Sequence, residues 1–288
     1  MADPKDHDDV TGVDTTGHEW DGIRELNNPL PRWWLWCFYA TIVWGVAYSI
    51  AYPAWPLISS ATGGVLGYSS RAEVAEDIAR VDAQNAEVSA RLASADLNTL
   101  SRDDPAHQYG VAGGAAVFRA NCSQCHGAGA AGAVGYPNLL DDAWLWGGSL
   151  DAIEYTVRHG IRNEADPDSR YSEMPAFGDI LERDEITAAA EYVVSLSNAE
   201  HDAALAETGA LVFEDNCASC HGEAALGDSE LGAPNLSDAI WLYGGSREAI
   251  TYTIENARFG VMPPWAPRLS EDEIKAVTLF VHQLGGGE

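Results

Sequence analysis

The hydrophobic pattern of the chain begins with one uninterrupted run, residues 33–58, which contains no charged residue. A bilayer core of ~30 Å requires about 20 apolar residues in a helix, so this run is long enough to cross it. Tryptophans gather at its start, and Tyr52 and Trp55 lie near its other end, as in an aromatic belt. The pattern predicts a transmembrane helix, with its regular part ending near Ala51 because Pro53 follows.

The residues around this run separate a membrane anchor from its alternatives. A cleaved signal peptide has a short basic leader, whereas residues 1–32 are long and acidic. A buried core helix of this length, without charge and with this aromatic content, is equally untypical. Arg24 and Arg32 precede the span and only Arg71 follows it closely, which favours a cytoplasmic N-terminus. Cys37 inside the span is interpreted as a small apolar residue.

The next segment, residues 59–108, is predicted to be a linker that contains a helix. It opens with a Gly/Ser-rich stretch, which is typical of flexible chain. From about residue 71 to 100, apolar side chains recur at helical spacing. These are Val74, Ile78, Val81, Val88 and Leu92.

From residue 109 the chain repeats itself. GAAVFRANCSQCHG at 114–127 matches GALVFEDNCASCHG at 209–222, and Pro-Asn-Leu, Gly-Gly-Ser, Met-Pro and Asp-Glu-Ile segments recur in the same order. The repeats predict two domains of one fold, 109–198 and 199–288. Each shows helical periodicity and no period-two strand, so the fold class is all-α. An insertion at 162–170 is expected to be a surface loop.

Each repeat carries a Cys-x-x-Cys-His motif, a spacing that suits covalent attachment of haem c. The two thiols form thioethers with the haem vinyl groups, and the imidazole ligates the iron. A large apolar cofactor would also supply the core that so small a domain lacks. The motif residues are Cys122, Cys125 and His126 in the first repeat, and Cys217, Cys220 and His221 in the second. The sequence therefore predicts two covalently bound haem c groups.

Two other readings of the cysteines were weighed. The four thiols could together form one zinc site, but this would leave both histidines and the repeated methionines without a role. A thioredoxin-like redox pair requires a βαβ context, which the pattern lacks.

The sixth iron ligand follows from the scarcity of methionine. The chain has three, and Met174 and Met262 each precede a proline at corresponding positions of the repeats. A thioether is a good soft ligand for ferrous iron, and Met/His ligation raises the potential. Ligation within the same domain is the simplest arrangement, while side-by-side packing would permit exchange. His159 is an alternative ligand.

Other residues are expected near the porphyrin or apart from it. Arg158 and Arg258 are candidates for pairing with the propionates. The remaining histidines are interpreted as solvated or structural. Expected to pack on the porphyrin or to support the propionates are Trp144, Trp146, Trp241 and Tyr243.

Composition then limits the function. The chain has 16 Lys+Arg against 44 Asp+Glu, a formal net charge of -28, which argues against nucleic-acid binding. The acidity of the two repeats either provides solubility alone or docks a basic donor cytochrome c. Haem c is attached outside the bacterial inner membrane, so both domains are expected in the periplasm.

The combined features resemble a known family. The lead-in DGI-x-E-x-NNPLPRWW at 21–34, the YPAWP segment at 52–56 and the two cytochrome c domains resemble the dihaem subunit III (FixP/CcoP) of cbb3-type cytochrome c oxidases. The resemblance covers essentially the whole chain. It implies that the motif residues and both methionines hold the haems. It also implies that electrons pass from a donor cytochrome c towards a monohaem subunit and a haem–copper catalytic subunit.

The residues themselves favour electron transfer over catalysis, because two six-coordinate haems leave no open iron position. The chain is thus expected to be no enzyme by itself but an electron-transfer subunit of an oxidase. The alternatives are a dihaem peroxidase, which needs a displaceable ligand, and a cytochrome subunit of a periplasmic dehydrogenase. Co-purification with b-type haem and copper, or with a dehydrogenase, would distinguish them.

Overall fold

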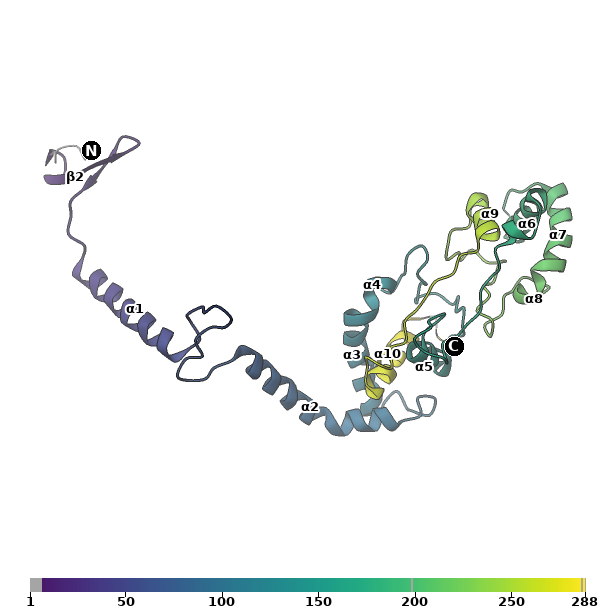
Figure 1. Ribbon diagram of the computed structural model, residues 1–288, viewed down its shortest axis with the longest axis horizontal. Coiled ribbons are helices and arrows are strands. Elements are labelled where there is room, and N and C mark those ends of the chain that lie inside the picture. The colour runs from purple at the N-terminus through teal and green to yellow at the C-terminus, as the bar shows by residue number, and fades with distance from the viewer. Residues whose placement is uncertain (1–6, 198, 286, 288) are drawn as a thin grey trace. The chain divides into compact units, whose positions relative to one another are not determined.

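The computed structural model describes residues 7–197, 199–285 and 287. The chain forms two compact units, one up to Ala83 and one from Gln84 onward (Figure 1). Each unit is described by itself.

The first unit opens with a small antiparallel sheet, in the order β1-β2-β3. Its strands are β1 (His7–Asp8), β2 (Val13–Trp20) and β3 (Ile23–Leu26). Polar side chains join neighbouring strands; the Trp20 indole, for example, donates to Glu25 at 3.1 Å. The sequence pattern does not predict these strands, because the segment lacks the alternation of apolar and polar residues that marks a half-buried strand.

Helix α1 (Arg32–Ala51) follows the sheet. It is long and apolar enough to cross a membrane, and none of its side chains is buried within the chain. The helix ends at Ala51, as the prolines beyond it predict. After it, the chain turns back, so that the Val65 amide donates to the Ile50 carbonyl at 2.9 Å.

Helix α2 (Ser70–Ser94) confirms the predicted amphipathic helix and leads into the second unit. Its C-terminal end is tied to the unit's core: Leu92 is fully buried and packs with Leu279. The Lys275 ammonium donates to the Ala93 carbonyl at 2.9 Å. This end of the helix is therefore fixed by the last helix of the chain.

The second unit contains two lobes built from the repeats. The first lobe consists of α3 (Pro105–Val117), the π-helical turn η1 (Phe118–Cys122), α4 (Ser123–His126), α5 (Leu150–His159) and α10 (Glu271–His282). The second lobe consists of the 3-10 turn η2 (Phe177–Asp179), α6 (Arg183–Leu196), α7 (Ala203–Asn216), α8 (Ala218–His221) and α9 (Arg247–Asn256).

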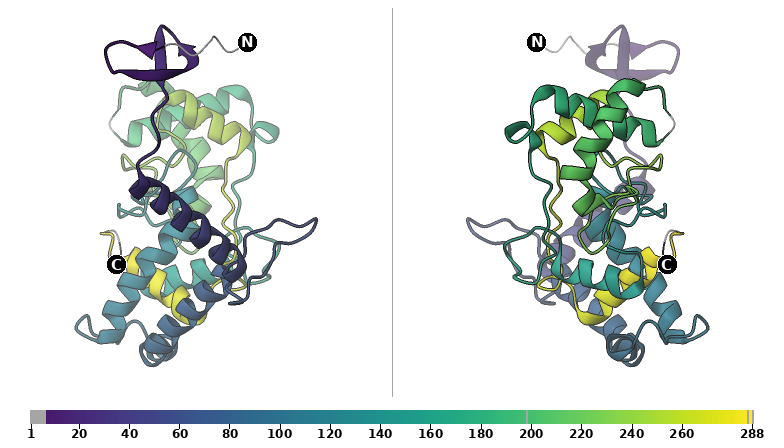
Figure 2. Two further views of the ribbon diagram at one scale, coloured as in Figure 1. Left: turned by 90° about the vertical axis from the view of Figure 1, so that its left-hand side faces the viewer. Right: turned by 90° about the vertical axis from the view of Figure 1, so that its right-hand side faces the viewer.

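The final helix of each repeat lies in the lobe of the other repeat. Helix α10 packs on α3, and α6 packs on α7; the two pairs are separate in Figure 1, and the yellow α10 stays beside the blue-green α3 in both views of Figure 2. The predicted boundaries at 109–198 and 199–288 mark the sequence repeats. The packed lobes differ from them because the repeats exchange this one element.

Both helix pairs cross at a glycine. A Cβ on Gly114 of α3 would lie 2.0 Å from the Ala276 carbonyl oxygen of α10, and one on Gly209 of α7 would lie 1.9 Å from the Ala188 carbonyl oxygen of α6. These contacts occupy corresponding positions of the repeats. The same helix crossing is thus made twice, each time between helices of different repeats.

Two extended segments of the chain run from one lobe to the other and connect the exchanged helices to the rest of their repeats. Ile161 and Met262 pair through their backbones: each amide donates to the other's carbonyl, at 2.9 and 3.0 Å. The predicted surface loop at 162–170 begins at this crossing. Its middle is mostly exposed, and Arg162 and Arg170 at its two ends are half-buried.

Each lobe has its own hydrophobic core. The first contains Phe118, Ile153, Val157, Ile274, Val277 and Val281, and the second contains Phe177, Ile186, Val193, Val194, Phe213, Ile250 and Ile254. The unit is helical, as predicted.

Candidate functional site

The second Cys-x-x-Cys-His motif begins where α7 ends. Cys217 is half-buried at the end of α7, and Cys220 and His221 lie on the single turn α8. The Cys220 amide donates to the Cys217 carbonyl at 3.1 Å, so one helical turn joins the two residues. Residues three apart on a helix are neighbours, and both cysteines line the same cavity.

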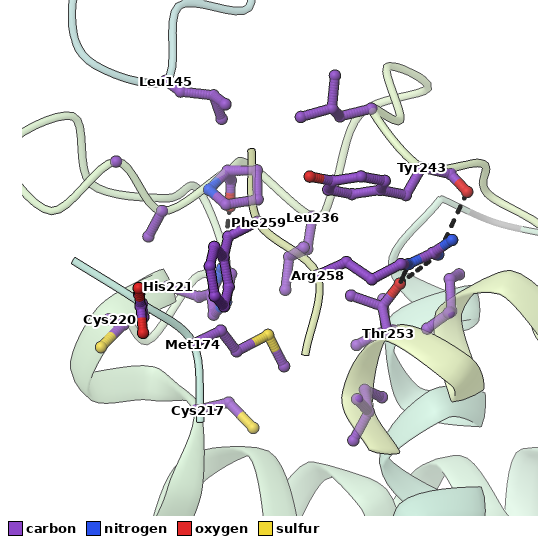
Figure 3. A pocket seen from close by; sticks show the side chains of 18 of the residues that line it. Leu145, Met174, Cys217, Cys220, His221, Leu236, Tyr243, Thr253, Arg258 and Phe259 are labelled. Atoms are coloured by element: carbon purple, nitrogen blue, oxygen red, sulfur yellow. Dashed lines mark hydrogen bonds between the residues drawn. The ribbon is translucent and has the colours of Figure 1, made fainter. Parts of the chain in front are cut away.

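The motif borders a cavity between α6, α7 and α9 (Figure 3). Met174 also lines this cavity and packs in the same core cluster as Cys217. Met174 comes from the first repeat, whereas the cysteines come from the second. Other apolar residues that line the cavity include Phe213, Leu236, Trp241, Ile250 and Ile254.

The first motif has the matching arrangement in the other lobe. Cys122 ends η1, and Cys125 and His126 lie on α4. Cys122 packs on the core of the first lobe, and so does Met262, which comes from the second repeat. Trp144 and Trp265 pack on the same core. Each motif therefore shares a lobe with the methionine of the other repeat, the exchange that the sequence left open.

Both motif histidines are held by a backbone carbonyl. The Nδ1 atom of His126 lies 3.1 Å from the Pro137 oxygen, and that of His221 lies 3.0 Å from the Pro234 oxygen. Because a carbonyl can only accept, Nδ1 carries the hydrogen and Nε2 keeps its lone pair for a metal. Burial lowers the pKa of both imidazoles, which favours the neutral form that ligation requires.

The two thiols of each motif differ in environment. Burial raises the pKa of Cys122 and of Cys217 to about 11, so both are neutral thiols at pH 7. Cys125 and Cys220 are exposed. One thiol of each pair therefore faces the lobe interior and the other lies at its surface.

This donor set fits a covalently bound haem. An apolar cavity, two thiols one turn apart, an oriented imidazole and a thioether meet in the second lobe, and the first lobe has the same residue types. Among the residues that the structure describes, the four motif cysteines form no common metal-binding cluster. The zinc alternative therefore has no support in the geometry.

Other predicted residues lie in different surroundings. Trp241, Tyr243 and Arg258 line the cavity of the second lobe. Arg158 pairs with Glu154 at 2.9 Å and with Glu271 at 2.7 Å, so its guanidinium has two carboxylate partners within the chain. His159 forms a pair with Asp166, its Nδ1 lying 3.0 Å from the carboxylate.

The structure adds Arg162, which the sequence analysis did not single out. Its side chain lines the second-lobe cavity and donates to the Gly260 carbonyl at 3.0 Å. Its guanidinium carbon lies 5.8 Å from the centre of the Trp146 ring and 5.7 Å from that of Phe259. Arg162 lies in the insertion of the first repeat, so no residue of the second repeat matches it. Comparing the two repeats therefore could not indicate a role for Arg162.

Two family descriptions match the chain. Residues 12–59 match the N-terminal domain of cytochrome oxidase-cbb3, FixP. Residues 110–193 and 204–281 each match cytochrome c oxidase, cbb3-type, subunit III.

Curated proteins resemble the chain over nearly its full length. The cbb3-type cytochrome c oxidase subunit CcoP of Cereibacter sphaeroides is 57% identical over 276 residues, covering 95% of both chains. The subunit FixP of Sinorhizobium medicae is 52% identical over 289 residues, covering 100% of both. The subunit CcoP of Rhodobacter capsulatus is 53% identical over 287 residues, covering 96% of this chain and 97% of the relative.

Proposed function

The chain belongs to the family of subunit III of cbb3-type cytochrome c oxidases, and from this premise we propose that it carries two haem c groups, one in each lobe. It is a membrane-anchored, electron-transfer cytochrome subunit of the oxidase. The observation that carries the number two is the duplicated donor set, with an oriented histidine in each lobe.

The proposed ligand sets cross between the repeats. The first haem takes Cys122, Cys125, His126 and Met262, and the second takes Cys217, Cys220, His221 and Met174. This assignment is supported by the shared cavity of Met174 and Cys217 and by the shared core of Met262 and Cys122. His126 and Met262 would therefore hold the iron in one lobe, and His221 and Met174 would hold it in the other.

The haem would supply a one-electron carrier, and the protein residues would set its position and its reduction potential. The thioethers fix the position of the group, and the Pro137 and Pro234 carbonyls orient the imidazoles through Nδ1. The methionine thioethers favour the reduced state and raise the potential. The apolar core residues exclude water, which limits reorganisation when charge changes.

With a histidine and a methionine holding each iron, no position would be left for a substrate, so we propose that the chain by itself is not an enzyme. We infer that the haem lobes lie in the periplasm and residues 1–32 in the cytoplasm, since Arg24 and Arg32 flank the span on that side. The proposed partners are a donor cytochrome c, the monohaem subunit and the haem–copper catalytic subunit. No nucleic acid is involved, consistent with the strong acidity.

The proposal is tested on the purified membrane complex. Pyridine haemochrome analysis should give two haem c per chain, together with b-type haem and copper from the other subunits. Replacing Cys122 and Cys125 by Ala should halve the haem c of this chain on a haem-stained gel. Unchanged staining would contradict the assignment of a haem to the first motif.

A further inference from the structure

Two arginines occupy equivalent places in the two lobes, although they do not align in the sequence repeats. The guanidinium carbon of Arg258 lies 4.7 Å from the Tyr243 ring centre and 5.2 Å from that of Tyr252. The guanidinium carbon of Arg170 lies 5.4 Å from the Trp146 ring centre and 4.9 Å from that of Tyr155. Trp146 and Tyr243 each precede the Gly-Gly-Ser turn, and Tyr155 and Tyr252 each follow it at the same spacing.

The insertion at 162–170 delivers the first of these arginines. In the second repeat, Arg258 directly follows α9 and its one-residue turn at Ala257. The corresponding position of the first repeat is Ile161. The insertion brings the chain back beside it: the Arg170 amide donates to the Gly160 carbonyl at 3.3 Å, and the Arg170 carbonyl accepts from the Arg162 amide at 2.7 Å. The loop thus returns a guanidinium to the place that Arg258 holds in the other lobe.

Neither arginine has a carboxylate partner among the described residues, although the chain has many more acids than bases. The buried Nε of Arg170 has no hydrogen-bond acceptor. Arg258 is held by Thr253 Oγ1 and by the Tyr243 and Ala249 carbonyls, all of them neutral. Burial lowers the pKa of Arg170, and Tyr155 partly opposes this shift.

The location of Arg258 indicates which anion it would bind. It lines the same cavity as Cys217, His221 and Met174, and lies across that cavity from the motif (Figure 3). In a haem bound through its vinyl groups to two cysteines, the propionates lie at the edge away from the thioethers. A guanidinium at that edge would contact a propionate carboxylate, and the planar donors of the guanidinium match the geometry of this group.

We propose that Arg170 and Arg258 are equivalent carboxylate-binding residues, each pairing with a propionate of the haem in its own lobe. The insertion in the first repeat therefore supplies a propionate ligand. This proposal rests on the haem binding proposed above. Both arginines are positioning residues: they hold the haem edge and offset the propionate charge, which otherwise favours the oxidised state.

The test measures the two midpoint potentials in the purified complex. Arg170→Gln should lower the midpoint potential of one haem, and Arg258→Gln should lower that of the other. Each decrease should be ~59 mV, which for one electron corresponds to a tenfold change in the ferrous-to-ferric ratio. The affected potential should also become more pH-dependent, because the unpaired propionate titrates nearer neutral pH. Arg183→Gln removes the same charge from an exposed site at the start of α6 and should change neither property.

Arg170→Lys and Arg258→Lys keep the positive charge. These variants distinguish the loss of the pair with the propionate from a loss of folded structure. Their potentials should stay nearer the original than those of the Gln variants, while the propionate bending band in resonance Raman spectra shifts. The proposal is wrong if potentials, pH dependence and this band match those of Arg183→Gln in protein that retains two haems. Haem missing from the unsubstituted chain would instead contradict the proposed function.

Discussion

The backbones of Ile161 and Met262 are hydrogen-bonded to each other in both directions, at 2.9 and 3.0 Å. The two residues belong to different repeats and lie on the two segments that cross between the lobes. The pairing fixes Met262 at the entry to the first lobe, where it packs near Cys122. The same crossing leads the other segment on to Met174 and the second lobe.

The crossed assignment of the methionines can be measured directly. Met174→Leu should lower the potential of the haem attached at Cys217 and Cys220 by more than ~59 mV, because loss of the thioether destabilises the ferrous state over tenfold. Cys220→Ser, which leaves one thioether, marks this haem by shifting its absorption band. Potentiometry at the marked band then identifies the haem that responds.

Met262→Leu is the matched control in the marked protein. It should leave the potential at the marked band unchanged and lower the other. The opposite pattern, with Met262→Leu acting on the marked haem, would establish ligation within each repeat.

The glycines at the helix crossings should not tolerate a side chain. Gly114→Val and Gly209→Val each place a Cβ within about 2 Å of a carbonyl oxygen, so the helices must separate. Overpacking of this kind costs about 1–3 kcal/mol, and each variant should lower the thermal midpoint of its lobe. Gly113→Ala is the control, because nothing lies within 4 Å of its added Cβ. Equal melting of all three variants would refute the importance of these crossings.

The exchange of helices also predicts which fragments of the chain should acquire covalent haem. Residues 171–260 contain α6 to α9, Met174 and the second motif, so a periplasmic fragment of this range should take up one haem. Residues 109–198 lack α10 and should yield little haem protein, since α3 then loses its partner. The comparison is made by haem-stained gel and circular dichroism. Efficient maturation of 109–198 alone would show that the final helices are interchangeable.

Acid should destabilise the second lobe through the ion pair of the buried Glu191 with the partly exposed Arg247. Glu191 is buried, accepts from Arg247 and from the Asp202 amide, and its pKa is lowered chiefly by Arg247. A lowered pKa in the folded state gives stability that is present above the unfolded value, 4.5, and lost as pH falls through the folded value. Glu191→Gln should melt earlier at pH 7, with the difference from the unsubstituted chain shrinking below pH 4.5.

Electron transfer from a basic donor cytochrome c should depend on salt. Residues 109–198 carry five Lys+Arg and thirteen Asp+Glu, and residues 199–288 carry four and fifteen, which leaves -8 and -11. Opposite fields raise the association rate by about 10-fold or more at low ionic strength, and screening removes this gain. Stopped-flow oxidation of the donor should slow as salt rises, mainly in the second-order constant. A rate independent of salt would favour solubility as the role of these charges.

The sequence by itself predicted the membrane-spanning helix, the two repeats and the candidate haem-binding residues. The uncharged run predicted helix α1 and Pro53 its end, while the two motifs and the rare methionines supplied the proposed donor atoms. These signals are local because they arise from bilayer thickness, backbone restriction and ligand type. The polar strands before the span escaped prediction, because cross-strand pairs such as Trp20 with Glu25 leave no alternating pattern.

Only the tertiary structure decided which residues meet across the repeats. Helices α6 and α10 carry their crossing alanines, Ala188 and Ala276, at corresponding positions of the repeats, so the repeat pattern does not tell which of them packs on α3 and which on α7. The pairing depends on contacts between residues far apart in the chain, such as the backbone pairing of Ile161 with Met262, and the repeat pattern does not contain them. For the same reason Arg170 could not be matched to Arg258 from sequence, since a folded loop, and not alignment, brings it to the equivalent place.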